Sequence, residues 1–410
     1  MKIGHPVVDL ECEALVRAVR RDDPSGDGLL EALGSGINWP RLIDLSVRHR
    51  VMPLLCARLQ SLGERNPAPL EIMARLKTLR RLNEGKNLVM LGKLAEILDI
   101  FGRNGIEAIV LKGPALAVAA YGSVGMRQFD DLDILIRPRD YECVKSLMAG
   151  LGFRQNEQGT RAQEAEYFRR NYGSEFIDTR GKAFVEITTK LTDLLNEVGL
   201  ETEDLFARKE IITTEGMKLL SLSAEDALIY LCFHGTKHIW PLLGMISDLA
   251  AFVASRHDWP WEELLERAQK AGLRRNFLLG LQLARDIAGI ELPEVIDCKP
   301  RYDAVAARLR DQIHTNLFWP RINELTYLEL ALHNLKRRER ISDKMSFILR
   351  RLVGLSPMDW KTIPLPDCLF SLYIPLRVIR LLATLVFPGL GVRMNRDFRN
   401  RKARRQPDSG

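Results

Sequence analysis

Residues 106–191 constrain the fold most, because short β-branched runs and a helical segment follow one another there. IEAIVLKG (106–113) is a β-branched run that ends in glycine, which is typical of a strand. PALAVAAY (114–121) is rich in helix-forming residues and begins with proline, whose missing N–H costs no hydrogen bond at the first position of a helix. In DLDILIRP (131–138), polar and apolar residues alternate at the start of a run that ends in proline. We therefore predict a strand, a helix and a strand in this order.

The pattern continues to residue 191. YECVKSLMAGLGF (141–153) has the spacing of an amphipathic helix. EFIDT (175–179) and AFVEITTKL (183–191) read as two more strands, separated by a turn at residues 180–182. Together these segments predict one compact α/β unit over residues 106–191.

The flanking regions predict helices. ECEALVRAVR (11–20) and the segment 39–62 have apolar residues at spacings of three and four, and a longer helix follows that ends at Gly102 or Gly105. From Ser221 to about Ile348 the pattern is helical again, with Ser223 as the N-cap and acidic residues in the first turn. We expect an α+β fold with a small mixed sheet, flanking helices, and helical regions at both ends. The expected parts are an N-terminal helical segment, a core, a C-terminal helical domain and a basic tail without fixed structure, at residues 1–83, 84–200, 201–393 and 394–410.

The basic charge is concentrated at the C-terminal end. The formal net charge is +7, and residues 369–410 contain nine Lys or Arg against two Asp, so the remainder of the chain is formally neutral. A neutral body would be a poor general binder of nucleic-acid backbones, since that affinity scales with the number of phosphates neutralised. The longest charge-free run there, residues 381–392, is too short to cross a bilayer, which needs about 20 residues. We expect no transmembrane segment, and weak membrane or nucleic-acid contact only through the tail.

The six cysteines and the N-terminal residues indicate the compartment. The cysteines are scattered, with no two closer than forty residues. Their spacing therefore fits neither a zinc knuckle nor a C-x-x-C redox pair. The first thirty residues mix acids and bases among apolar residues, unlike a secretory signal. We expect a cytoplasmic protein whose cysteines are reduced core thiols.

Asp131 and Asp133 are the strongest candidates for a catalytic or metal-binding role. Residues two apart in a strand point to the same face, so the two carboxylates would be neighbours while Leu132 and Ile134 face the core. Neighbouring carboxylates repel each other, and a hard divalent cation such as Mg²⁺ relieves that repulsion. The alternative is that both acids merely lie where a loop enters a strand at the solvent edge. Glu186 adds a third acid, on the face opposite Val185 and Ile187.

The Lys112-Gly113 junction is the second candidate feature. A strand that ends in glycine and leads into a helix leaves backbone N–H groups that can bind phosphate. A glycine junction, two acids in one strand and a third acid in a later strand occur here in order. This combination favours a phosphate and metal site over three unrelated surface features.

These residues lie in a stretch that resembles a known family. Residues 111–153 resemble the bacterial uncharacterised nucleotidyltransferase family of the DNA polymerase beta superfamily, in which a strand ending in Lys-Gly, an arginine and a D-x-D precede a helix ending in Gly-Phe or Gly-Tyr. The helical segment 222–253 and the segment 358–382 resemble the family too, so the resemblance covers most of residues 40–390.

The resemblance implies a reaction and roles for the candidate residues. It implies transfer of a nucleoside monophosphate from an NTP to a hydroxyl of an acceptor, with release of pyrophosphate and with two Mg²⁺ ions. Asp131 and Asp133 would hold the ions, and Glu186 would complete the second metal site and act as a base. Lys112, Gly113 and Arg127 would bind the triphosphate. The alternative for Lys112 and Arg127 is that they belong to a solvated basic face. Neither the acceptor nor the base of the NTP can be read from the residues.

Two departures from the family pattern support an alternative function. The junction reads Gly113-Pro114 where relatives have Gly-Ser or Gly-Gly, and Glu186-Ile187-Thr188-Thr189 stands where relatives tend to have Asp-Leu-His-Trp. The alternative is a non-catalytic nucleotide-binding or accessory protein that keeps the nucleotidyltransferase fold.

His234, Lys237 and His238 are the last candidates. The two histidines are four residues apart, so both imidazoles would project from one helical face, with Lys237 on the neighbouring face. The glutamate that follows the first histidine in zinc proteases is absent, and no third ligand is evident. We expect these residues to be core histidines or substrate contacts rather than zinc ligands.

Deleting residues 394–410 should leave folding and nucleotide binding intact and should remove salt-sensitive adhesion to anionic vesicles. Each basic residue near an anionic surface contributes about 1 kcal/mol to binding. Vesicle co-sedimentation at low and high salt measures the adhesion, neutral vesicles are the control, and circular dichroism follows the fold. A truncated protein that unfolds would show that the tail is structural.

Overall fold

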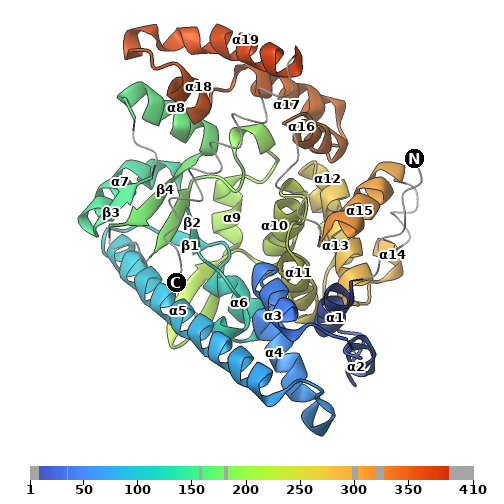
Figure 1. Ribbon diagram of the computed structural model, residues 1–410. Coiled ribbons are helices and arrows are strands. Elements are labelled where there is room, and N and C mark those ends of the chain that lie inside the picture. Colours follow the sequence, from blue (N-terminus) through green and yellow to red (C-terminus); the bar gives the residue numbers. More distant parts are fainter. Residues whose placement is uncertain are drawn as a thin grey trace. The chain divides into compact units, whose positions relative to one another are not determined.

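Seven strands form one mixed sheet in the computed structural model (Figure 1). Their order is β3-β4-β5-β2-β1-β7-β6. This architecture, with helices on its flanks, confirms the expected α+β class. The strands are β1 (Ala108–Val110), β2 (Leu132–Ile136), β3 (Phe153–Gln155), β4 (Gly173–Asp178), β5 (Phe184–Thr188), β6 (Glu210–Thr214) and β7 (Met217–Ser221). The structure describes residues 9–34, 36–156, 159–179, 183–297, 303–318 and 327–386.

The chain divides into two compact units that are interleaved along the sequence. The first unit comprises Met1–Glu96, Val110–Asp130 and Arg208–Ile322, and the second comprises Ile97–Ile109, Asp131–Ala207 and Asn323–Gly410. The four consecutive parts expected from the sequence remain a prediction. Among the described residues, none of the helices combines the length and the apolar character that crossing a bilayer requires.

The first unit is mainly helical. Its helices are α1 (Leu10–Val19), α2 (Asp27–Ala32), α3 (Trp39–Arg48), α4 (Met52–Ser61), α6 (Pro114–Tyr121), α10 (Ala224–Lys237), α11 (Leu243–Ala254), α12 (Trp261–Lys270), α13 (Arg274–Ala288), α14 (Glu294–Asp297) and α15 (Ala304–Asn316), and the long α5 (Leu70–Arg103) begins in it. Ser223 caps α10 as expected, because its side chain accepts a hydrogen bond from the backbone N–H of Asp226 at 3.2 Å. Asp226 is fully buried and forms ion pairs with Arg208 and Arg267.

A hairpin in the first unit corrects one sequence expectation. The strands β6 and β7 lie in residues 201–393, which we expected to be helical, and they pair antiparallel from Glu210↔Ser221 to Thr214↔Met217. The turn between them is Glu215-Gly216, with φ values of 46° and 76°. Both residues have positive φ, as a two-residue hairpin turn requires. The β-branched run at residues 211–214 followed by Glu-Gly was the signal available in the sequence.

The cysteines also differ in part from the expectation. Cys56 and Cys232 are buried, whereas Cys143 and Cys368 are exposed and Cys12 is intermediate. Burial raises the pKa of the Cys232 thiol, so that it stays protonated in the core. The description as core thiols therefore holds for two cysteines, and Cys298 lies outside the described residues.

The second unit contains the acidic strands. β2 pairs parallel with β5, β5 pairs antiparallel with β4, and β4 pairs antiparallel with β3. Every residue of β2 is buried, which is typical of a central strand covered on both faces. The helices of this unit are α7 (Tyr141–Gly150), α8 (Arg161–Asn171), α9 (Thr202–Arg208, which ends at the unit boundary), α16 (Tyr327–Lys336), α17 (Ile341–Val353), α18 (Pro357–Thr362) and α19 (Tyr373–Val386).

A buried carboxylate joins α18 to α19 in the second unit. Asp359 accepts hydrogen bonds from Arg377 at 2.7 Å and from Arg380 at 2.6 Å. The side chains of Asp359 and Arg377 are each only 2% exposed. Burial raises the pKa of Asp359, but the two arginines lower it more, so the pKa lies below its ordinary value of 3.8. The apolar segment with two arginines therefore packs on its own unit through these arginines.

Replacing Asp359 with Asn should destabilise the protein by about 3 kcal/mol, because it leaves two arginines without their shared carboxylate. Since the folded pKa is depressed, the stabilisation is present above pH 3.8 and declines as the pH falls through the lower folded pKa. Urea unfolding of parent and variant at pH 7 and near pH 3 measures both effects. The difference in free energy of unfolding between parent and variant should be smaller near pH 3 than at pH 7. A difference that does not depend on pH would contradict the assignment. Asp204→Asn, an exposed acid of the same unit, is the control and should change stability by less than about 0.5 kcal/mol.

Candidate active site

The residues predicted from the sequence fall into two groups, one in each unit. Lys112, Gly113, Arg127 and the α10 residues 234–238 belong to the first unit. Asp131, Asp133 and Glu186 belong to the second. The chain passes from one unit to the other between Asp130 and Asp131.

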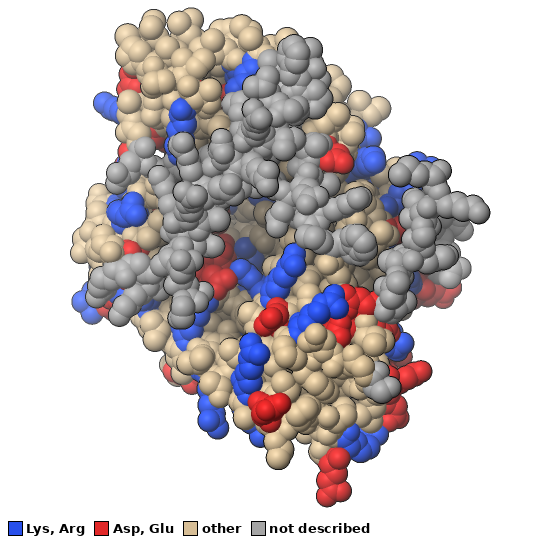
Figure 2. Space-filling model, viewed as in Figure 1, with Lys and Arg blue, Asp and Glu red and all other residues tan. Residues whose placement is uncertain are grey.

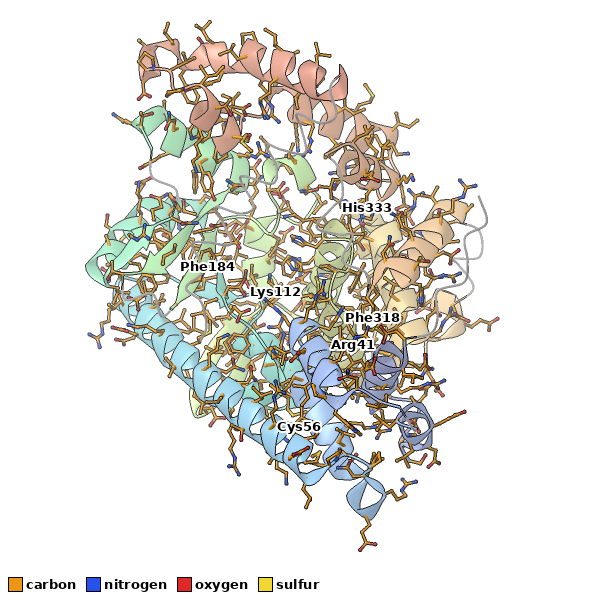
Figure 3. All side chains as sticks on the ribbon, in the orientation of Figure 1. Arg41, Cys56, Lys112, Phe184, Phe318 and His333 are labelled. Atoms are coloured by element: carbon orange, nitrogen blue, oxygen red, sulfur yellow. The ribbon has the colours of Figure 1, made fainter. Side chains whose placement is uncertain are left out.

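The junction between β1 and α6 has the glycine that its backbone requires. Gly113 is the N-cap of α6 with a φ of 60° and a ψ of −123°, a region that residues with a side chain rarely adopt. Pro114 occupies the first helical position, where its ring geometry suits the helix but supplies no N–H. Lys112, which is labelled in Figure 3, directly precedes this glycine in the sequence. The junction therefore keeps the predicted strand, glycine and helix order, with one backbone donor fewer than a Gly-Ser junction would have.

Lys112 lies beside His234, a contact that the sequence analysis did not predict. The distance from Lys112 Nζ to His234 Nε2 is 3.5 Å. Burial lowers the pKa of His234 well below its usual value, and the neighbouring Lys112, His238 and Lys237 lower it further. A neutral imidazole protonated at Nδ1 accepts a hydrogen bond from the Lys112 ammonium at Nε2. His234 therefore positions Lys112 without neutralising its charge.

The histidines share one face of α10, as predicted. The ring centroids of His234 and His238 are 4.6 Å apart, and the ring of Tyr230 is 5.7 Å from that of His234. His238 caps the C-terminal end of α10 and is exposed, while Lys237 is partly exposed. The two imidazoles are therefore neighbours, and one of them, His234, contacts Lys112.

The backbone after His238 is strained. Ile239 and Trp240 have φ values of 64° and 49°, although neither is glycine. Each residue in this region costs about 1–3 kcal/mol. The conformation is held by the Trp240 ring, which is 1% exposed and packs where Gly235 has no side chain. The indole Nε1 also donates to Thr236 Oγ1 at 3.3 Å. Such strain clusters at functional sites, which adds weight to α10 as part of one.

Arg127 is fixed by an ion pair rather than lying on a solvated basic face. Its Nε donates to Asp248 Oδ2 at 2.7 Å, and the two side chains are 13% and 11% exposed. Tyr121 donates its hydroxyl to Asp248 Oδ1 at 2.9 Å. Burial raises the pKa of Tyr121 well above its usual value, and Asp248 raises it further. The phenol therefore stays protonated and acts as a donor.

Two asparagines of α5 also hold the Arg127 segment. Asn83 and Asn87 donate to the Arg127 carbonyl oxygen at 3.1 and 2.8 Å, and Asn87 also donates to the carbonyl of Val124 at 2.7 Å. The sequence analysis missed these residues and Tyr121. A pair of asparagines four residues apart in a helix was an available signal for the two amides.

The predicted acids of the second unit lie on one face of the sheet. Asp133 of β2 pairs in register with Glu186 of β5, and Glu186 pairs in register with Glu175 of β4. Asp131 directly precedes β2 and is partly exposed. Residues paired in register project to the same side, so these strands carry a row of carboxylates. Sequence analysis missed Glu175, which also accepts a hydrogen bond from Asn156 Nδ2 at 2.7 Å.

The opposite face carries the apolar residues, as expected. Leu132 and Ile134 of β2 lie beside Val185 and Ile187 of β5, and all four are buried. Asp133 is itself only 4% exposed, so it is not an acid at a solvent edge, whereas Glu186 is exposed. Carboxylates of this kind fit a hard divalent cation such as Mg²⁺ in ligand type. Within the described ranges, however, no three His, Cys, Asp or Glu side chains are grouped so that they could hold a metal ion.

Asp130, the neighbour of Asp131 in the chain, is already neutralised within the first unit. It forms ion pairs with Lys86 and, at 2.7 Å, with Arg50. Burial raises its pKa, but these cations lower it more, so the pKa lies below the ordinary value. Figure 2 shows the same mixing of opposite charges on the visible face, where Lys and Arg are interspersed with Asp and Glu. Asp130 is therefore held by cations of the first unit and is not one of the candidate metal ligands.

Comparison with known proteins identifies the family. The profile of the uncharacterised nucleotidyltransferase family matches residues 35–289, which is more than half of the chain. The matched range contains every predicted site residue from Lys112 to His238, and it ends before the segment 358–382. No curated protein matches the chain. The chain therefore belongs to the uncharacterised nucleotidyltransferase family.

Proposed function

We propose that this protein is a metal-dependent nucleotidyltransferase that moves a nucleoside monophosphate from an NTP to a hydroxyl of an acceptor. Membership of the family supports nucleotidyl transfer in general. The observation that carries the more specific proposal is the register of β2 and β5, which sets the buried Asp133 beside Glu186 on one face. Two adjacent carboxylates repel each other unless a cation lies between them.

Asp131, Asp133 and Glu186 are the residues proposed to hold Mg²⁺, although the three side chains are not gathered as a three-ligand group in the structure. When bound, the cation would neutralise charge on the triphosphate and lower the pKa of the acceptor hydroxyl. The protein's own part is to present carboxylate oxygens from the rigid β2 and β5, which a strand does more accurately than a loop. Glu186, as the exposed member, is the acid proposed to take the proton of the acceptor hydroxyl.

The first unit would bind the triphosphate. Lys112 keeps its charge beside the neutral His234, so its ammonium can pair with a phosphate oxygen. Arg127 is held in place by Asp248, which restricts its rotamers before any ligand arrives. The backbone at Gly113 and the polar side chains of Lys237 and His238 complete the proposed contacts with the NTP or the acceptor.

A second candidate function is nucleotide binding without transfer. Pro114 removes one N–H from the first turn of α6, and the described acids are not gathered into a three-ligand group. These observations support a protein that senses a nucleotide with the first unit. Binding without turnover would separate this function from the first.

Asp131→Asn and Asp133→Asn should each abolish metal-dependent transfer, and stability should be unchanged or raised because repulsion between like charges is relieved. Transfer is measured with labelled NTPs against crude extract, and Mg²⁺-NTP binding by calorimetry. Asp204→Asn, an exposed acid on α9, is the matched control and should retain parental activity. If the double Asn variant binds Mg²⁺-NTP as tightly as the parent, the metal assignment is wrong.

Replacing His234 and His238 together with Gln should weaken NTP binding about tenfold, the cost of roughly one hydrogen bond to a charged group. Calorimetry measures the binding, and elemental analysis of the native protein should find no stoichiometric zinc. His257→Gln provides a control at an exposed histidine outside α10. One zinc per chain in the native protein would instead identify the pair as metal ligands.

A further inference from the structure

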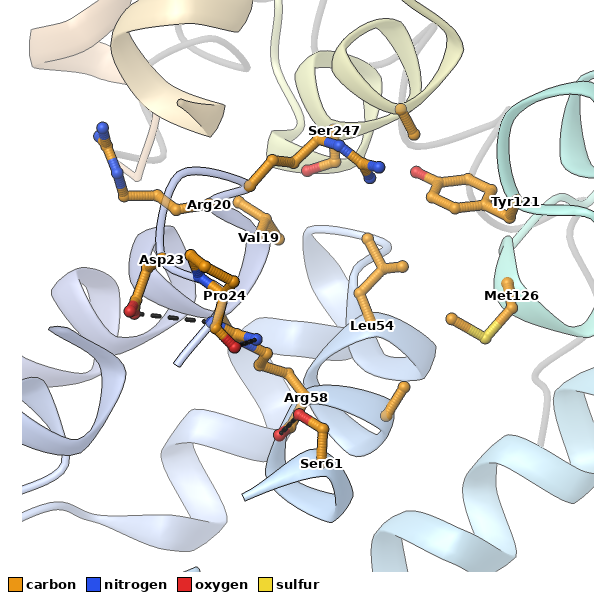
Figure 4. Close-up of a pocket in the computed structure, with 14 residues that line it drawn as sticks. Val19, Arg20, Asp23, Pro24, Leu54, Arg58, Ser61, Tyr121, Met126 and Ser247 are labelled. Atoms are coloured by element: carbon orange, nitrogen blue, oxygen red, sulfur yellow. Dashed lines mark hydrogen bonds and ion pairs between the residues drawn. The ribbon is translucent and has the colours of Figure 1, made fainter. Parts of the chain in front are cut away.

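A cavity of about 370 Å³ lies within the first unit, lined by residues of α1, α4, α6 and α11 and of the loop that follows α1 (Figure 4). This volume is within the range of sites for small molecules. None of the residues that line it belongs to the groups predicted from the sequence. Three arginines and one acid, Asp23, are its charged residues.

Arg58 of α4 lines this cavity, and part of its hydrogen-bonding capacity is not used. Its Nη1 donates to the Pro24 carbonyl oxygen at 3.3 Å. Its Nε and Nη2 are buried and have no hydrogen-bond partner. A guanidinium has five N–H donors, and leaving them unsatisfied in a buried place costs about 1–3 kcal/mol, more for a charged group. The Nε and Nη2 donors of Arg58 therefore have no hydrogen-bond acceptor among the described residues.

Asp23 does not supply these acceptors. Its Oδ2 is 3.6 Å from Arg58 Nη2, beyond good hydrogen-bond distance (Figure 4). The same Oδ2 accepts from the backbone N–H of Leu29 at 3.2 Å, and Oδ1 accepts from the N–H of Gly26 at 3.0 Å. Both oxygens of Asp23 thus accept hydrogen bonds from backbone N–H groups at the start of α2. Its charge only partly offsets that of Arg58.

The other two arginines differ in their partners. Arg20 is neutralised by Asp22, since its Nε donates to Asp22 Oδ1 at 2.8 Å. Arg21 is exposed, and among the described residues no acidic side chain forms an ion pair with it. Its charge acts on Tyr121, whose pKa it lowers against the larger effect of burial. Arg20 pairs with Asp22 and Arg58 forms a long ion pair with Asp23, so the charged groups at the cavity leave a formal excess of one positive charge, that of Arg21.

The remaining lining is partly apolar. Val19, Leu54 and Met126 offer apolar contacts, and the hydroxyl of Ser247 donates to the Leu243 carbonyl at 3.0 Å, which leaves its oxygen able to accept. A ligand that fits all these features has an anionic head group, an apolar body and a hydrogen-bond donor.

We propose that this cavity is a binding site for a small organic anion, whose carboxylate or phosphate is held by Arg58 and Arg21 and whose body lies against Leu54 and Met126. The forked guanidinium of Arg58 is suited to either head group, because both present two oxygens in matching geometry. The proposal rests on the cavity and its charges alone and holds whether or not the protein transfers nucleotides.

The test uses phenyl phosphate and benzoate as anionic probes and benzamide as a neutral probe of similar shape. Binding is followed by NMR of the full chain labelled at its methionine methyl groups, with the Met126 signal assigned from Met126→Leu. At least one anion should shift the Met126 signal in a saturable manner, and benzamide should bind at least tenfold more weakly. Stronger binding of phenyl phosphate than of benzoate, or the reverse, identifies the preferred head group.

Arg58→Gln should weaken binding of that anion at least tenfold. Because this change could also disturb α4, Arg21→Gln is a second variant at an exposed side chain and should weaken binding at least threefold. Arg65→Gln is the matched control, since Arg65 pairs with Asp27 outside the cavity and the variant should bind like the parent. Absence of a saturable Met126 shift, equal binding of benzamide, or unchanged binding in both cavity variants would overturn the proposal.

Discussion

The register between β2 and β5 determines what the acidic sequence of this chain can do. Side chains alternate between faces along a strand, so a slip of one residue would bury Glu186 and expose its apolar neighbours. The apolar pairs Leu132 with Val185 and Ile134 with Ile187 prevent that slip, since all four are fully buried. The hydrophobic face therefore fixes the position of the polar face. The pairing of Asp133 with Glu186 is a consequence of core packing as much as of any attraction at the site.

The cations of the first unit are organised by a different principle. Lys112 and Arg127 each have a neighbour that fixes the side chain, and the two neighbours differ in charge. Asp248 pairs with Arg127 and offsets its charge, whereas His234 is neutral and leaves the charge of Lys112 intact. The two cations are therefore positioned in different ways, Arg127 by an ion pair and Lys112 by a neutral imidazole. Hydrogen bonds from Asn83 and Asn87 to the Arg127 carbonyl, and from Tyr121 to Asp248, make the Arg127 segment a rigid support.

Local features of this fold could be predicted from the sequence, and contacts distant in sequence could not. The strands at 108–110, 132–136 and 184–188 and the Ser223 cap follow from periodicity and capping preferences, which act over a few residues. The β6–β7 hairpin was missed because its Glu-Gly turn lacks the Asn-Gly or Asp-Gly pattern that marks such turns most strongly. Arg127 and Asp248 are 121 residues apart, and no local pattern indicates which acid a given arginine will meet. Glu175 joined the acidic row only through the pairing of β4 with β5.

The packing of Trp240 also bears on how this sequence can change over evolutionary time. A methyl group added at Gly235 would collide with the indole ring, and one added at Gly280 of α13 would meet Cys232 and the same ring. Substitutions at these positions are therefore not independent, since a larger residue at Gly235 requires a smaller one at 240, and a larger residue at Gly280 requires smaller ones at 232 and 240. The left-handed backbone at Ile239 would lose its support in that exchange. Variation at the end of α10 should thus occur as linked sets of changes, and single substitutions there should be rare.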